Sequence, residues 1–91
     1  ENMPQATQSR LTFPAAFPIK VMGLTQEGFA QAILAVVQRH AQDFEPSTME
    51  MRASSAGKYL SLTCTINAVS RDQLDNLYRD LTAHPMVVMV L

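Results

Sequence analysis

The sequence is poor in the residues that support most metal and covalent chemistry. Its 91 residues include one cysteine, two histidines and no tryptophan. A lone Cys64 cannot form a disulfide within the chain, nor a thiolate cluster for zinc or an iron–sulfur centre. His40 and His84 have no acidic pair at metal-ligand spacing beside them. We therefore expect neither a metal site nor a bound cofactor.

Charge of one sign and long apolar runs are also scarce. Seven Lys and Arg residues against eight Asp and Glu give a net charge of -1, which attracts neither nucleic acid nor anionic membrane strongly. The longest apolar runs, 32–37 and 86–91, fall far short of the roughly 20 residues that cross a bilayer. The composition, with its single cysteine, predicts a cytoplasmic protein, and the polar start does not match a signal peptide. The three glycines form no nucleotide-phosphate motif.

The chain contains enough apolar residues for one hydrophobic core. Hydrophobic residues make up 47% of the sequence, and its length allows a single domain. Residues 1–12 are polar and lack a regular apolar period, which predicts a flexible N-terminal tail. We therefore expect one domain over residues 13–91.

The first half of this domain predicts a strand followed by a helix. Phe17, Ile19 and Val21 share one phase of an alternating pattern, which predicts a strand over 17–23. Thr25 is positioned as the N-cap of a helix over 26–41. Gly28 lies inside this predicted helix, where it would allow close approach to a sheet.

The next segments predict a β-hairpin. Met49, Met51 and Ala53 alternate with polar residues in a second strand, and residues 54–57 supply a turn. The third strand has one apolar phase, formed by Leu60, Leu62, Cys64, Ile66 and Ala68. Its other phase is mostly hydroxylated and consists of Tyr59, Ser61, Thr63, Thr65 and Asn67. One face of this strand is therefore expected in the core and the other in water.

A second helix and a last strand complete the domain. Ser70 and Gln73 form a capping-box pattern, and the helix that follows ends before Pro85. Residues 86–91 predict a strand that is apolar in both phases. The order βαββαβ predicts an α+β, ferredoxin-like sandwich, in which a four-stranded antiparallel sheet carries two helices on one face.

The last strand would lie at the edge of this sheet and needs covering. We therefore expect a homodimer that extends or stacks the two sheets, with Met22 and Met89 as apolar contacts. An alternative is a protein–protein interaction adaptor that presents polar and aromatic contacts around an apolar sheet surface. The candidate contacts are Lys20, Arg52, Lys58 and Tyr59.

Several segments resemble one known family when their order and spacing are taken together. They are Phe13-Pro14, Lys20-Val21-Met22-Gly23, Val36-Val37-Gln38-Arg39-His40-Ala41, Gly57-Lys58-Tyr59, Leu77-Tyr78 and residues 87–91. Over about residues 13–91 the chain resembles the YbeD-like family of small, uncharacterised bacterial proteins. The resemblance implies a fold similar to ACT regulatory domains, which sense amino acids or other small metabolites at subunit interfaces. It also implies a connection with lipoate metabolism, because genes for lipoate attachment often lie near those of family members.

The resemblance further implies a place for a ligand. In ACT domains the turn from the first strand into the first helix contributes to binding, and residues 22–26 match that turn. Gly23 would allow close backbone approach, and Thr25 and Gln26 would supply polar contacts. The segment departs from many ligand-binding ACT domains, which carry an acidic residue and a proline before the glycine.

Signals for catalysis and RNA binding are weaker than this regulatory interpretation. His40, Asp43 and Cys64 could form a thiol site, but Cys64 lies in an apolar phase, where burial disfavours the thiolate. Asp72, Asp75 and Asp80, on the polar side of the second helix, are expected to be solvated charges rather than a general acid and base pair. An RNA-recognition module shares the layout, yet Tyr59 is the only aromatic residue in the outward phase of the third strand. We therefore expect a non-enzymatic regulatory or binding domain.

Overall fold

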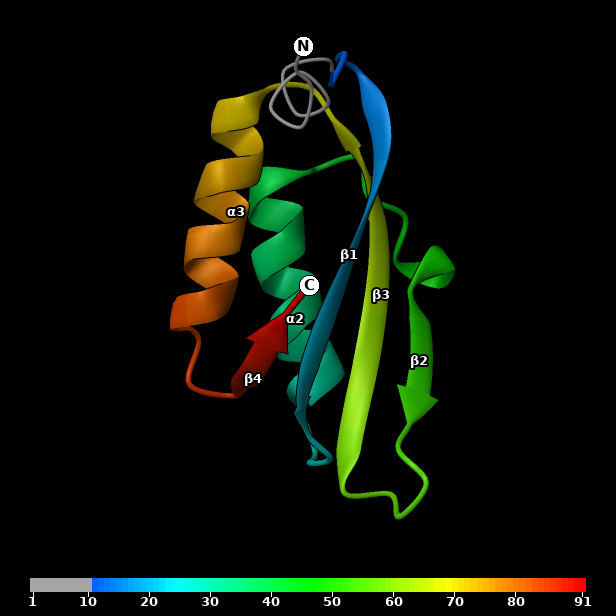
Figure 1. Ribbon diagram of the computed structural model, residues 1–91. Coiled ribbons are helices and arrows are strands. Elements are labelled where there is room, and N and C mark those ends of the chain that lie inside the picture. The colour runs from blue at the N-terminus through cyan, green and yellow to red at the C-terminus, as the bar shows by residue number, and fades with distance from the viewer. Residues whose placement is uncertain (1–10) are drawn as a thin grey trace, which may run out of the picture.

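The computed structural model describes residues 11–91. Its elements are β1 (Ala15–Leu24), α2 (Phe29–His40), a 3-10 turn (Pro46–Thr48), β2 (Glu50–Ala53), β3 (Tyr59–Ala68), α3 (Arg71–Ala83) and β4 (Val87–Val90) (Figure 1). Most of the predicted tail, residues 1–10, lies outside the described residues. Leu11, at the end of that predicted tail, packs against the core.

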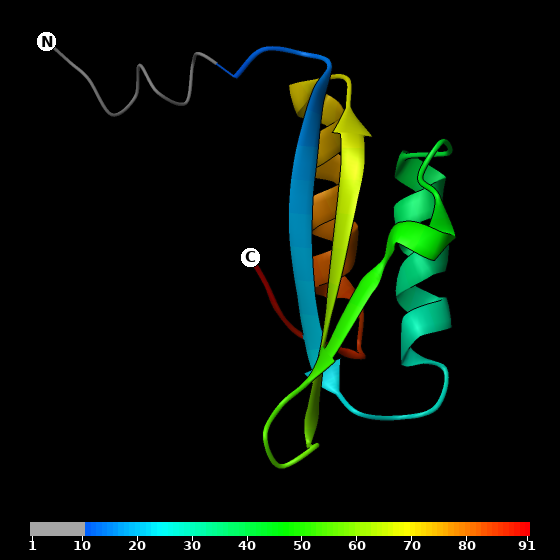
Figure 2. The same cartoon turned by 90° about the vertical axis from the view of Figure 1, so that its right-hand side faces the viewer.

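The four strands form one antiparallel sheet in the order β2-β3-β1-β4. Its centre is the β1–β3 pair, which runs without interruption from Ala15 opposite Ala68 to Leu24 opposite Tyr59. Both helices lie on the same side of the sheet, and none of residues 11–91 forms a helix on the other side (Figures 1 and 2). The predicted ferredoxin-like arrangement is confirmed.

The core lies between the sheet and the two helices. Ile19 and Val21 of β1 are fully buried, as the predicted inward phase requires. The remaining residues with at most 4% exposure on β3 and the helices are Leu62, Cys64, Ile66, Ala68, Phe29, Ile33, Val36, Val37, Leu74, Leu77 and Leu81. Burying each large side chain of this kind stabilises the fold by about 1.5–3 kcal/mol. The helices therefore cover one face of the sheet with apolar groups.

The first helix begins later than predicted. It starts at Phe29, and Gly28 precedes it with φ of +87°, so Gly28 lies in the turn that leads into the helix. Thr25 is not its N-cap, because Gly28 occupies that position and no side chain caps the helix. The Thr25 amide donates to the Lys58 carbonyl at 2.9 Å. Only glycine adopts this left-handed backbone readily, and the chain uses it to enter α2. Adding a Cβ at Gly28 would meet no atom within 4 Å, so close approach to the sheet is not its role.

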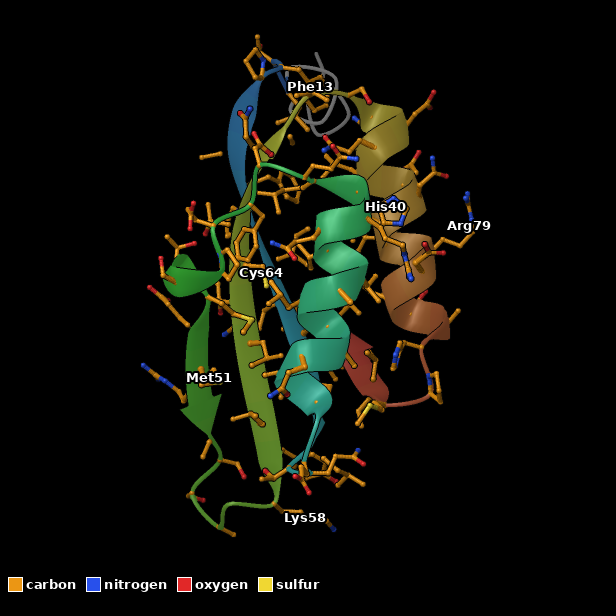
Figure 3. The ribbon with its side chains drawn as sticks, turned by 180° about the vertical axis from the view of Figure 1, so that it is seen from behind. Phe13, His40, Met51, Lys58, Cys64 and Arg79 are labelled. Atoms are coloured by element: carbon orange, nitrogen blue, oxygen red, sulfur yellow. The ribbon has the colours of Figure 1, made fainter. Side chains whose placement is uncertain are left out.

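The second strand does not bury the phase predicted for it. All four residues of β2 are exposed, and Met51 has an exposed fraction of 62%. Met51 pairs with buried Leu62, but β2 is an edge strand that extends past the helix layer (Figure 3). Met49 packs against the core from a position just before the strand. The burial of an edge strand depends on where the helices lie, which its own alternation does not reveal.

Gln73 joins the start of α3 to the end of α2. The Gln73 amide donates to the Ser70 hydroxyl at 3.0 Å, which confirms the predicted cap. Its side-chain oxygen accepts from the Val69 amide at 2.7 Å, and its side-chain nitrogen donates to the His40 carbonyl at 2.7 Å. This one side chain therefore satisfies a backbone group before the start of α3 and another at the end of α2.

Candidate binding site on the open face of the sheet

The sheet surface opposite the helices is called the open face here. Side chains on a strand point to alternate faces, so this surface carries the residues between the buried positions of β1 and β3. The strand register arranges them in two rows across the sheet. One row contains Glu50, Thr63 and Lys20, and the next contains Arg52, Ser61, Met22 and Met89. Charged, hydroxylated and apolar groups therefore lie side by side without a helix above them.

Two adjoining depressions occupy this surface. The larger, of about 410 Å³, is lined by Lys20, Glu50, Met51, Arg52, Ser61 and Thr63. The smaller, of about 240 Å³, is lined by Lys20, Met22, Arg52, Ala53, Ser54, Tyr59, Ser61 and Leu91. Lys20, Arg52 and Ser61 border both depressions, so the two adjoin. Together they are called the hollow here, with a polar part and a more apolar part.

The charges around this hollow are not used by the fold. Lys20, Glu50 and Arg52 form no ion pair with one another or with any other residue among 11–91. Two cations and one carboxylate give the polar part a local excess of positive charge. The half-buried Ser61 and Thr63 lie on β3 between the two cation-bearing strands. The arrangement offers hydrogen-bond donors of both charged and neutral kinds to a bound group.

The structure brings together most of the residues that were predicted to make contacts. Four of the six line the hollow: Lys20, Met22, Arg52 and Tyr59. Lys58 lies beside it, with its ammonium nitrogen 5.5 Å from the centre of the Tyr59 ring. Met89 pairs with Met22 across β1 and β4 and has an exposed fraction of 47%. These side chains come from all four strands and the hairpin between β2 and β3.

The predicted ligand-binding turn lies apart from this hollow. Neither depression is lined by Gly23, Thr25 or Gln26. Gly23 is buried, and a Cβ there would collide with the Met86 carbonyl and lie 2.7 Å from the Phe29 ring. The space beside Gly23 is therefore filled by Phe29 and Met86 of the protein itself, and not left open for a ligand. Thr25 and Gln26 are exposed in the turn that precedes α2.

Sequence reasoning did not single out Glu50, Ser61 and Thr63 as binding residues. The alternation of β3 placed both hydroxyls on the outward phase, but it did not show what would lie next to them. Glu50 joins them because it pairs with Thr63, a register set by the β2–β3 hairpin. The length of the turn at residues 54–58 was the available signal, because it sets the pairing of β2 with β3 and thereby places Glu50 beside Ser61 and Thr63.

Cys64 has the surroundings of a packing residue. It is fully buried, as predicted, and burial raises the pKa of its thiol from 9.0 to about 11. Burial also raises the pKa of Tyr78, whose ring packs edge-on against Phe17. A thiol with so high a pKa supplies almost no thiolate at neutral pH. Cys64 is thus poorly suited to act as a nucleophile.

His40 pairs with a carboxylate of the other helix. Its Nε2 lies 2.6 Å from Oδ2 of Asp80, which joins the end of α2 to α3. Figure 3 shows His40 between the helices and Cys64 between the sheet and α2. The expectation that Asp80 is only a solvated charge is wrong, because helix packing places it against a residue 40 positions earlier.

Residues 11–91 contain neither a cluster of metal-ligating side chains nor a membrane-spanning helix. No three or more His, Cys, Asp and Glu side chains gather there in a way that could hold a metal ion. None of the helices in this part of the chain has the length and apolar content needed to span a membrane.

The fold defines an ACT-like, ferredoxin-type domain. The solution structure of the ACT domain from GTP pyrophosphokinase of Chlorobium tepidum is similar, with a TM-score of 0.62 and 20% identity, covering 81% of this chain and 80% of that one. The solution structure of protein HP0495 from H. pylori is also similar, with a TM-score of 0.74 and 15% identity, covering 100% of this chain and 97% of that one. At these identities the likeness concerns the fold.

The chain belongs to the family described as "Protein of unknown function (DUF493)", which matches residues 8–91. A UPF0250 protein of Nitrosomonas europaea is 54% identical over 84 residues, covering 92% of this chain and 97% of that protein. A UPF0250 protein of Janthinobacterium sp. is 54% identical over 85 residues, covering 93% of each. The family expected from the sequence is confirmed.

Proposed function

We propose that this protein is a non-enzymatic regulatory domain that binds a small molecule in the hollow of the open face. The observation that carries the proposal is the pair of cations on the border of both depressions, Lys20 and Arg52, which have no ion-pair partner within residues 11–91. A binding site commonly combines a concave surface with a few converging polar groups. Charge-assisted hydrogen bonds from such groups would add affinity without disturbing interactions of the fold.

The groups that could perform covalent chemistry support a binding role over catalysis. Cys64 is buried on the helix side of the sheet, and its high pKa keeps it protonated. His40 is paired with Asp80 between the helices, away from Cys64 (Figure 3). A nucleophile and its base need to lie within hydrogen-bond reach of each other, but the hydrogen-bond partner of His40 is Asp80 and not Cys64.

The likeness to an ACT domain of a GTP pyrophosphokinase also supports a regulatory role. A ligand bound in the hollow would lie at a different position from the one that the sequence resemblance implies. The resemblance favours the turn with Gly23, Thr25 and Gln26, whereas the hollow lies over the middle of the sheet. An experiment that maps bound ligands onto individual backbone amides separates these two locations.

The test is a screen of metabolite pools against the ¹⁵N-labelled chain, followed by thermal unfolding with each ligand found. We expect a ligand that shifts the amide resonances of Ser61 and Thr63 and raises the unfolding temperature. The double variant Lys20→Ala, Arg52→Ala should lose both effects. Arg79→Gln, on the exposed side of α3, should keep them. Ligands that shift only the amides of 23–26, or no ligand at all, would contradict the proposal.

A protein-binding role is the second candidate, and exposed apolar side chains favour it. Val88, Met89 and Leu91, in and after β4, have exposed fractions of 59%, 47% and 62%. An uncovered apolar edge strand can pair with another chain, including a second copy of itself. Co-purification of a specific partner, without a metabolite-induced thermal shift, would favour an adaptor. The link to lipoate metabolism stays a prediction for either role.

For the homodimer we expect Met89→Glu to lower the mass measured by sedimentation to that of a monomer. The charge would be placed in the apolar contact, while the fold should persist because Met89 lies outside the core. Arg79→Glu on α3 is the control and should leave the mass unchanged. If Met89→Glu also leaves the mass unchanged, this strand does not form the interface.

A further inference from the structure

We propose that the ligand of this hollow is a monocarboxylate with a short apolar tail, its carboxylate between Lys20 and Arg52 and its tail over Met22 and Tyr59. The inference rests on the proposed function and names the class of molecule that the same hollow would accept. Three features of the hollow lead to it, concerning the charged head, the number of charges and the tail.

The cations and hydroxyls define the head group. Lys20 on β1 and Arg52 on β2 border both depressions, and Ser61 on β3 lies between them. A guanidinium can donate two parallel hydrogen bonds to a carboxylate, and an ammonium adds a third donor. Neither cation has an ion-pair partner among the described residues, so a bound carboxylate would displace none.

Glu50 limits the ligand to a single negative charge. It lines the same depression as the two cations and pairs with Thr63 in the neighbouring row. A second negative charge on the ligand would approach this carboxylate and be repelled. A phosphate dianion or a nucleic-acid backbone would therefore bind less well than a monoanion. The same residue argues against RNA on the open face.

The smaller depression provides the place for a tail. It shares Lys20, Arg52 and Ser61 with the larger one and adds the apolar surface of Met22, Tyr59 and Leu91. A head group held by the two cations would therefore place an attached chain directly over that surface. Contact with the flexible thioether of Met22 and the Tyr59 ring removes apolar area from water and adapts to the shape of the tail.

The experiment is a titration of the ¹⁵N-labelled chain with hexanoate, acetate, hexan-1-ol and hexyl phosphate at one ionic strength. We expect hexanoate to shift the amides of Ser61 and Thr63 with a dissociation constant about tenfold lower than that of acetate or hexan-1-ol. Hexyl phosphate at pH 8, where it is a dianion, should bind more weakly than hexanoate. Equal binding of hexan-1-ol, or tighter binding of hexyl phosphate, would overturn the inference.

Three variants test the roles of the charged residues. Arg52→Gln should weaken hexanoate binding about tenfold, whereas the matched control Arg79→Gln should leave it unchanged. Glu50→Gln should tighten it severalfold, because a repelling charge is removed. Undiminished binding to Arg52→Gln would overturn the assignment of the head group.

A zwitterionic ligand is distinguished by comparing leucine with 4-methylpentanoate, which has the same tail but no ammonium group. Tighter binding of leucine, lost on Glu50→Gln, would overturn the monocarboxylate. If hexanoate fails while another metabolite shifts Ser61 and Thr63, this inference falls and the proposed function stands. If no compound shifts these amides, both fall.

Discussion

The two faces of the sheet are built from alternate residues of the same strands, yet they differ in almost every property. Ile19 is fully buried under the helices, and its neighbour Lys20 is exposed on the open face. Among residues 11–91, the buried set under the helices contains no polar or charged side chain. The open face instead carries charges around a hollow, and these charges form no ion pair within the described part of the chain. A single backbone layer separates the buried apolar face from the exposed polar face, so substitutions on the open face should leave the stability of the fold nearly unchanged.

The sharpest test of this separation uses adjacent residues. Ile19→Ala should lower the free energy of unfolding by about 2–5 kcal/mol, because it leaves a cavity in the covered core. Lys20→Ala should change it by no more than about 0.5 kcal/mol, since the side chain is exposed and lies outside the core. Urea unfolding measures both. Comparable losses from the two substitutions would contradict the division between the faces.

Gly23 tests whether the covered side tolerates added volume at the end of β1. Gly23→Ala should destabilise the fold by about 1–3 kcal/mol, because the new methyl group meets the Phe29 ring and the Met86 carbonyl. Adding Phe29→Leu to that variant should recover part of the loss, since the two positions share one space. Gly57→Ala is the control. At φ of +75° with open space around it, its cost is backbone strain of about 1–2 kcal/mol, independent of Phe29. A neutral Gly23→Ala would show that the packing there is loose.

The buried thiol should make stability fall at alkaline pH. The pKa of Cys64 is raised from 9.0 to about 11, so the folded chain keeps a proton that the unfolded chain releases. Stability is therefore fully present below about pH 9 and decreases as the pH rises through 11, by about 3 kcal/mol in total. Urea unfolding between pH 8 and 10.5 measures the slope. Cys64→Ala should remove most of it and leave the smaller contribution of Tyr78. An unchanged slope would place the thiol in contact with water.

The smallest effect concerns the contact between the two helices. A double-mutant cycle with His40→Ala and Asp80→Ala should give a coupling of about 0.2–1 kcal/mol, because the Asp80 side chain is 44% exposed. The bond from Gln73 to the main-chain carbonyl of His40 should survive both substitutions. A coupling well above this range would mean that the pair holds the helix layer together more strongly than an exposed ion pair does.

The covered face was predictable from the sequence to a large extent. Ile19, Val21 and Cys64 lie in the phases expected, because a strand surrounded by other strands turns every second side chain to the same layer. Met51 follows the same alternation and is nevertheless exposed, since β2 lies beyond the helix layer. Periodicity thus predicts which face each side chain of a central strand points to. Whether a side chain of an edge strand is buried depends on where the helices pack.

The candidate site was predictable only in part. Lys20, Arg52 and Tyr59 were expected to make contacts because they lie near an uncovered surface, and the structure places them around one hollow. Glu50 was missed because its position follows from the pairing of β2 with β3. The pairing of His40 with Asp80 was missed for a similar reason, because it joins two helices that are distant in the sequence. Contacts of this kind depend on tertiary packing, which a local pattern does not contain.

The unbroken pairing of β1 with β3 restricts how the length of this protein can change. One residue inserted after Leu60 would rotate every following side chain of β3 by half a turn. Thr63 and Thr65 would then point into the hydrophobic core, and Leu62 and Cys64 would point into solvent. Insertions in the central strands are therefore tolerable only as pairs, or when a bulge absorbs them. Single-residue insertions and deletions should be confined to connections such as residues 54–58, because the side chains there are exposed and do not contribute to the core.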